Sequence, residues 1–125
     1  MSNGPGRPET LDLAVLASLR ELQEIGEPDI VAEIGGLFLE HAPQKLSAIR
    51  DAAERKDARG LQMAAHSLKS SSAYVGAMRL SALCKEMEEM GRSGSMEGVA
   101  EKARDLTAEF LHAKAALEEV IEGLG

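Results

Sequence analysis

The segment around His66 combines a potential nucleophile with the periodicity of an amphipathic α-helix. Its apolar and small residues recur at alternating spacings of four and three, at Leu61, Ala65, Leu68, Ser72 and Val75. At about 100° per residue, His66 points roughly 140° away from the middle of that stripe, so we expect the ring to face solvent. A neutral imidazole is a competent nucleophile near neutral pH, because histidine side chains ordinarily titrate at about pH 6.5.

The helix face that carries His66 is expected to be open to another protein. Residues three and four apart are neighbours on a helix, so this face also holds Gln62, Lys69, Ser70 and Ala73. Most of these side chains are small, and none should keep a large partner away from the ring. An exposed histidine is by itself usually only solvated surface, so its function has to be inferred from the wider motif.

That motif resembles the histidine-containing phosphotransfer (HPt) domains of bacterial and fungal phosphorelays. The matching pattern is His-x-Leu-Lys-x-Ser-Ser from position 66, followed by Gly-Ala at 76–77. The match continues through Leu80, Leu83, Cys84 and Glu88 to Gly91-Arg92. Length and helix plan extend the resemblance over most of residues 28–122. The family usually has glycine directly after the lysine. Here Ser70 stands in that place, which leaves the backbone less free to approach a partner.

The resemblance implies that His66 accepts a phosphoryl group from the aspartyl phosphate of a receiver domain and passes it to another receiver. It implies that Lys69 stabilises the phosphoryl charge, since unit charges ~4 Å apart interact by about 1–4 kcal/mol. It places Glu88 beside the ring of His66. The carboxylate of Glu88 would then orient the ring through a hydrogen bond. Equally, Glu88 and its neighbours Glu86 and Glu89 could form only a solvated charged face. The implied docking residues are Gln62, Ser70, Ala73 and Arg92.

Missing motifs favour a phosphocarrier over a kinase. The sequence has no glycine-rich phosphate-binding motif, so we expect no ATP-dependent kinase activity. It also has no acidic cluster of the receiver type. The partners that the resemblance implies are receiver domains and a hybrid sensor histidine kinase. Because this chain lacks an acidic cluster, the receiver would supply Mg²⁺, while this chain needs no cofactor and can act as a monomer. The alternative function is a helical adaptor that binds a receiver or a kinase without carrying phosphate.

Charge and composition exclude several other classes of protein. A net charge of −7 argues against binding to a nucleic-acid backbone, and a single cysteine excludes an internal disulfide. No apolar run approaches the ~18 residues that a membrane span requires. No signal peptide opens the chain, so we expect a cytoplasmic protein without nucleic-acid or membrane partners.

The expected fold is all-α, an antiparallel up-down four-helix bundle with an additional N-terminal helix. Aromatic residues make up only 2% of the chain, which favours helix packing through aliphatic side chains. Residues 1–9 are predicted to be a disordered leader and residues 10–125 the HPt domain. The N-terminal helix is predicted over about 11–25, where it could cover one end of the bundle, and the bundle over about 28–122.

Proline and glycine residues complicate the first bundle helix. Pro28 suits its first position, and Pro43 is expected to interrupt its apolar stripe and to kink the helix near His41. The pair Gly35-Gly36 lowers helix propensity by ~2 kcal/mol relative to alanine, and close contact with another helix is one explanation.

Capping residues predict the remaining boundaries. Asp57 is the expected N-cap of the histidine helix, which ends at about Tyr74. The next helix is predicted from Ala77 to Met90, and a turn at 91–94 follows it. Ser95 is predicted to cap the last helix, whose apolar stripe comprises Val99, Ala103, Leu106, Phe110, Ala113, Leu117 and Val120.

Other residues that could do chemistry have simpler interpretations. Cys84 lies on an inward stripe and is predicted to fill the core. His41 has no partner motif and is predicted to be surface. Glu109-x-x-His112 is half of a di-iron carboxylate pattern, but no second half exists and both residues are predicted to lie off the inward stripe. We therefore expect no metal site.

Overall fold

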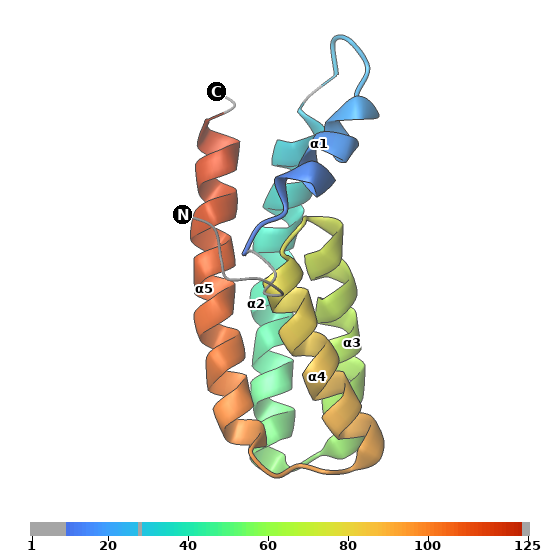
Figure 1. Ribbon diagram of the computed structural model, residues 1–125, viewed down its shortest axis with the longest axis vertical. Coiled ribbons are helices and arrows are strands. Elements are labelled where there is room, and N and C mark those ends of the chain that lie inside the picture. The colour runs from blue at the N-terminus through green and yellow to red at the C-terminus, as the bar shows by residue number, and fades with distance from the viewer. Residues whose placement is uncertain (1–9, 28, 124–125) are drawn as a thin grey trace.

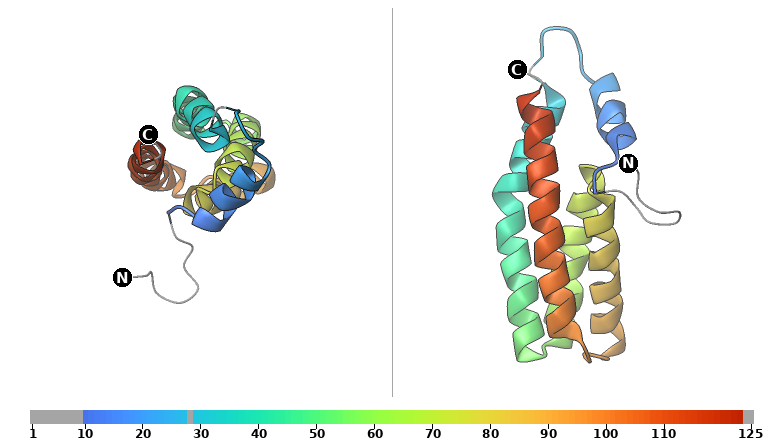
Figure 2. Two further views of the ribbon diagram at one scale, coloured as in Figure 1. Left: turned by 90° about the horizontal axis from the view of Figure 1, so that it is seen from above. Right: turned by 60° about the vertical axis from the view of Figure 1, so that its left-hand side comes forward.

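The computed structural model of the protein describes residues 10–27 and 29–123, which contain five α-helices (Figure 1). These are α1 (Leu13–Glu21), α2 (Ile30–Arg55), α3 (Ala58–Tyr74), α4 (Met78–Ser93) and α5 (Val99–Glu122). Helices α2 to α5 run antiparallel to their neighbours in the chain, and α1 lies over one end (Figure 2). The predicted up-down four-helix bundle with an additional N-terminal helix is confirmed. The predicted leader, residues 1–9, and Pro28, predicted at the first position of the next helix, lie outside the described residues.

Helix α1 is shorter than the predicted 11–25 and covers the turn between α3 and α4. Its N-cap is Asp12, whose side chain accepts a hydrogen bond from the Ala14 N–H at 3.0 Å. The Asp12 N–H donates to the Gly76 carbonyl at 2.7 Å, which ties α1 to the α3–α4 turn. Gly76 has a φ of +80°, and a Cβ there would lie 2.7 Å from the Asp12 carbonyl oxygen. Only glycine fits this turn.

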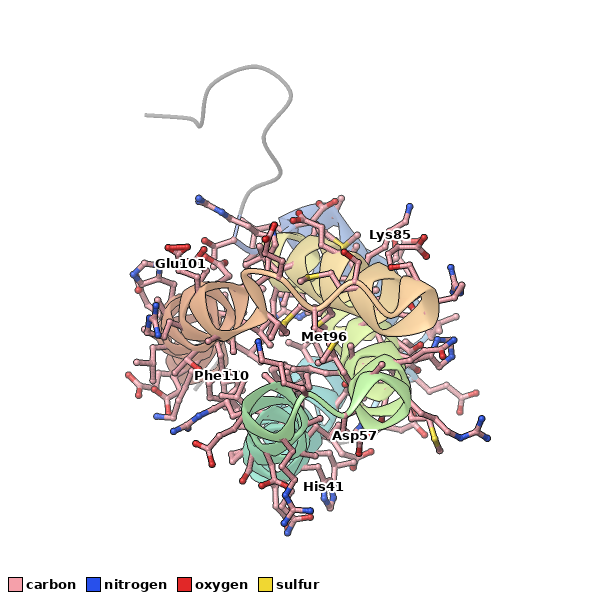
Figure 3. All side chains as sticks on the ribbon, turned by 90° about the horizontal axis from the view of Figure 1, so that it is seen from below. His41, Asp57, Lys85, Met96, Glu101 and Phe110 are labelled. Atoms are coloured by element: carbon pink, nitrogen blue, oxygen red, sulfur yellow. The ribbon has the colours of Figure 1, made fainter. Side chains whose placement is uncertain are left out.

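The core consists of the apolar stripes that the sequence predicts. In α5 the stripe is buried from Val99 to Leu117, while Val120 is only partly buried. Phe110 points between α5 and α2, where its ring centroid lies 6.3 Å from that of Phe38 (Figure 3). Aliphatic side chains fill most of the remaining interior, as expected from the low aromatic content.

Helix α2 runs without a break from Ile30 to Arg55 through Pro43, and the kink near His41 stays a prediction. Proline removes one backbone donor, but Pro43 lies on the exposed side of the helix, where water can satisfy the freed carbonyl. A Cβ at Gly35 would lie 3.0 Å from Cδ1 of Ile121, so close contact with α5 explains this glycine. At Gly36 a Cβ would meet no atom within 4 Å, and packing does not explain it.

The boundaries of the later helices were predicted with mixed success. Asp57 is the N-cap of α3, because its side chain accepts a hydrogen bond from the Gly60 N–H at 2.9 Å, as predicted. The predicted turn at 91–94 is wrong, since α4 continues through Gly91, which is buried against α3. Helix α5 begins after Gly98 rather than at the predicted cap, Ser95.

Candidate functional site

His66 lies in the middle of α3 with its ring in solvent. Its side chain is 61% exposed. The opposite stripe of the helix is sealed in the core: Leu61, Ala65, Leu68 and Ser72 are each 0% exposed. The predicted orientation of the histidine is therefore confirmed. The physical reason is the amphipathic pattern of α3, which turns its apolar face toward the bundle and the histidine away from it.

Glu88 of α4 joins His66 to the neighbouring helix. Its side chain is only 6% exposed, and its Oε2 atom lies 2.8 Å from His66 Nδ1. Lys69 Nζ donates a hydrogen bond to the other oxygen, Oε1, at 2.6 Å. The guanidinium of Arg92 lies 3.6 Å from Oε2. A nearly buried carboxylate thus has three basic side chains around it, and the alternative of a merely solvated face does not describe Glu88.

The charge state of Glu88 decides which ring nitrogen is free. The hydrogen bond from Lys69 lowers the pKa of Glu88, with a further contribution from His66, and together they outweigh the burial that would raise this pKa. Glu88 is therefore ionised at neutral pH, and a carboxylate can only accept hydrogen bonds. Nδ1 of His66 must then be the donor. In the neutral ring, the lone pair lies on Nε2.

Lys69 is less free than its position on the exposed face predicts. Its side chain is 29% exposed, and its ammonium group is bound to Glu88 rather than directed into open solvent. The sequence could not reveal this contact, because the partner lies 19 positions away on another helix. An ammonium group has three N–H donors, so the contact with Glu88 leaves others for a ligand.

A shallow depression of about 520 Å³ adjoins the ring and is lined by Arg59, Gln62, Met63, His66 and Glu88. Gln62 was predicted here, whereas Arg59 and Met63, which also belong to α3, were not. Met63 is a large apolar side chain that is 63% exposed, on a face where mostly small side chains were predicted. Helical spacing could have identified both missed residues, since they precede the histidine by three and seven positions.

The remaining predicted docking residues lie around this centre. Ser70 is exposed and Ala73 half-buried, one and two turns along α3 from His66, and neither lines the depression. Arg92 lies on α4, where its side chain is 54% exposed and pairs with Glu89 as well as approaching Glu88.

The other candidate residues lie apart from this site. His41 points away from the bundle (Figure 3). Glu109 is 5% exposed, so the prediction that it lies off the inward stripe is wrong; it lies 3.6 Å from His112 and 3.8 Å from Arg79. Within residues 10–27 and 29–123, no group of three or more metal-ligating side chains gathers. Cys84 is fully buried, as predicted, and burial raises the pKa of its thiol to about 12.

The sequence profile of the family described as "Hpt domain" matches residues 33–123 of this chain. The chain belongs to the Hpt domain family. The resemblance inferred from the motif around His66 is thereby confirmed at the level of the family. The match covers α3 and α4, and with them the pair His66 and Glu88.

Three relatives illustrate how far the likeness to other Hpt proteins extends. Histidine-containing phosphotransfer protein 2 of Arabidopsis thaliana is 30% identical over 105 residues, which cover 82% of this chain and 67% of that protein. Multistep phosphorelay regulator 1 of Schizosaccharomyces pombe is 28% identical over 91 residues, 73% of this chain but 31% of the regulator. The crystal structure of histidine-containing phosphotransfer protein B from Pseudomonas aeruginosa PAO1 superposes with a TM-score of 0.82 at 28% identity, covering 96% of this chain and 97% of that one. No helix in the described part of this chain is long and apolar enough to cross a membrane.

Proposed function

We propose that this Hpt protein is a phosphorelay intermediate that carries a phosphoryl group on His66. The observation that carries the proposal is the exposed ring whose Nδ1 is bound to the buried carboxylate of Glu88 at 2.8 Å. Membership of the Hpt family supports it, as do relatives named for histidine-containing phosphotransfer. The donor is the aspartyl phosphate of one receiver domain, and the acceptor is the aspartate of another.

The transfer needs no proton movement on this chain. The Nε2 lone pair of His66 attacks phosphorus, and the Nε2–P bond forms as the P–O bond to aspartate breaks. The aspartate carboxylate leaves with the electron pair. The proton on Nδ1 stays in place, so the ring gains positive charge, which the ionised Glu88 stabilises at hydrogen-bonding distance. The second transfer reverses these steps onto a new carboxylate.

Lys69 has two roles in this proposal. Its hydrogen bond keeps Glu88 ionised, and its remaining N–H groups stabilise the phosphoryl oxygens once they arrive beside the ring. Gln62, Ser70, Ala73 and Arg92 border the surface on which the receiver docks. The protein acts as a monomeric carrier rather than an ATP-dependent kinase, and the receiver supplies the Mg²⁺ that in-line phosphoryl transfer requires.

The test is to incubate the purified protein with a receiver domain that carries a radiolabelled aspartyl phosphate. We expect label that is stable to base and labile to acid on the wild type, and none on His66→Gln. Matched controls are His41→Gln and His112→Gln, which alter the two other histidines, both exposed, and should retain the label. A wild type without label, or a label that persists in His66→Gln, refutes the carrier function.

The same experiment separates the carrier from the adaptor. An adaptor would bind the receiver with equal affinity before and after His66→Gln and would take no label in either form. A carrier takes label whether or not its complex with the receiver is long-lived.

A further inference from the structure

Gly91 of α4 packs directly against the backbone of α3 next to the site. A Cβ at this position would lie 2.6 Å from the Ala58 carbonyl oxygen, 2.6 Å from the Gln62 nitrogen and 2.9 Å from the Gln62 Cα. All three are backbone atoms of α3, which cannot rotate away as a side chain can. Any residue larger than glycine would therefore push the two helices apart.

This contact is one helical turn from the reactive pair. Gln62 precedes His66 by four residues, and Gly91 follows Glu88 by three. Because a helix is stiff over one turn, the spacing at Gly91 sets the spacing between the ring and the carboxylate. The bond from Nδ1 to Oε2 is 2.8 Å long, and such bonds weaken beyond about 3.2 Å. A separation of more than about 0.4 Å would stretch it beyond that range.

A second tie fixes the same two helices on the other side of the pair. Ser81 of α4 is 8% exposed, and its hydroxyl donates a hydrogen bond to the Lys69 carbonyl of α3 at 3.0 Å. The His66–Glu88 bond therefore lies between two points at which the helices are held together, the close packing at Gly91 and the hydrogen bond of Ser81.

We propose that Gly91, assisted by Ser81, is a positioning residue that holds Glu88 at hydrogen-bonding distance from His66 and so selects the ring tautomer with a free Nε2. The inference deepens the proposed function and rests on it for the effect on transfer. Its effect on the tautomer is independent of any phosphoryl chemistry. Neither residue touches the phosphoryl group, since both act through the spacing of α3 and α4.

The decisive variant is Gly91→Ala, with two readouts. Nitrogen NMR of isotopically labelled histidine reports which nitrogen of His66 carries the proton. We expect Nδ1–H in the wild type and a shift toward the tautomer mixture of free histidine in the variant. The rate of phosphoryl acceptance from the receiver should fall about tenfold, as expected when a reacting group is misplaced by under an ångström.

Two matched controls are available on α2. The Cβ added by Gly35→Ala would lie 3.0 Å from the flexible end of the Ile121 side chain rather than from backbone. The Cβ added by Gly36→Ala would meet no atom within 4 Å. Both should keep the wild-type tautomer and the wild-type rate. This comparison separates an effect on the site from the general cost of filling a helical glycine.

Each outcome decides the proposal. A folded Gly91→Ala protein with the wild-type tautomer, or with the wild-type rate, overturns it. If Gly91→Ala does not fold, Ser81→Ala carries the test: a shift of the tautomer and a slower rate support the proposal, and no change in either overturns it. A wild type that takes no label contradicts the proposed function instead, and the tautomer measurement still tests the role of Gly91.

Discussion

Replacing Lys69 with alanine should destabilise the protein. From the sequence alone no loss of stability would be expected, because Lys69 lies on the exposed face of its helix. The ammonium group is bound at 2.6 Å to Glu88, whose side chain is 6% exposed. Removing it leaves a buried carboxylate with fewer donors, and an unsatisfied buried charge costs more than a lost surface contact. The folded state therefore loses stability even without any partner present.

The size of the loss follows from the environment of the pair. A hydrogen bond to a charged group contributes about 1.5–3 kcal/mol net. Lys69 is 29% exposed, and His66 and Arg92 remain near Glu88, so part of that contribution is retained in the variant. We expect a loss of about 1–2 kcal/mol in the free energy of unfolding. For a domain of this length, that lowers the melting temperature by roughly 4–8 °C.

The loss should depend on pH in a defined direction. The hydrogen bond from Lys69 lowers the pKa of Glu88 in the folded protein. A lowered carboxyl pKa adds stability above the unfolded pKa of about 4.3, and this stability disappears as the pH falls through the folded pKa. The gap between wild type and Lys69→Ala should therefore be full at neutral pH and close in acid, where Glu88 is protonated in both proteins.

Urea denaturation followed by circular dichroism at a series of pH values downward from about pH 7 measures this gap and the pH at which it closes. The matched control is Lys85→Ala, which removes an exposed lysine from α4. In a Glu88→Gln background the Lys69→Ala substitution should cost much less, because the charge that it leaves behind is gone. Equal stability of Lys69→Ala and Lys85→Ala at neutral pH would refute the reasoning.

Three further predictions concern the scaffold. The Cys84 thiol, whose pKa burial raises to about 12, should resist a colorimetric thiol reagent in the native protein and react after denaturation, and rapid native labelling would contradict its burial. Asp57→Ala should cost about 1 kcal/mol in urea denaturation because α3 loses its N-cap, while Asp57→Asn should retain most of the stability. Gly36→Ala should stabilise the protein by about 0.5–1 kcal/mol, since the added Cβ meets open space; destabilisation would mean that Gly36 has a packing role.

The fold and the exposure of His66 could be predicted from the sequence because both depend on local periodicity. The stripe of α3 repeats within one segment, and its pattern alone sets which side of the helix faces the core. Asp57 was predictable for the same reason, since a cap bonds to a backbone group three residues away. The proximity of Glu88 to the ring came from family resemblance, because no local pattern joins residues 22 positions apart.

The errors concern residues whose setting depends on another helix. Glycine after an apolar helix ordinarily indicates a turn, yet Gly91 is helical, and it is glycine because α3 leaves no room for a side chain. Lys69 lies on a face that was expected to be open, but its ammonium group is bound to Glu88 of α4, a contact that no pattern within α3 indicates. Glu109 is buried although its residue type favours the surface. In each case packing between helices outweighs the preference of the residue, and a single sequence does not contain that contact.

The proposed chemistry requires a carboxylate that is both buried and ionised, and these conditions oppose each other. Burial favours the protonated acid, so Glu88 keeps its charge because its hydrogen bonds with Lys69 and His66 together lower its pKa more than burial raises it. The charge on Glu88 in turn keeps the proton on Nδ1. That proton matters for release as much as for capture, because the ring then leaves phosphorus as neutral imidazole rather than as an imidazolate anion. One hydrogen bond of 2.8 Å therefore serves both directions of transfer, which a carrier needs and a terminal acceptor does not.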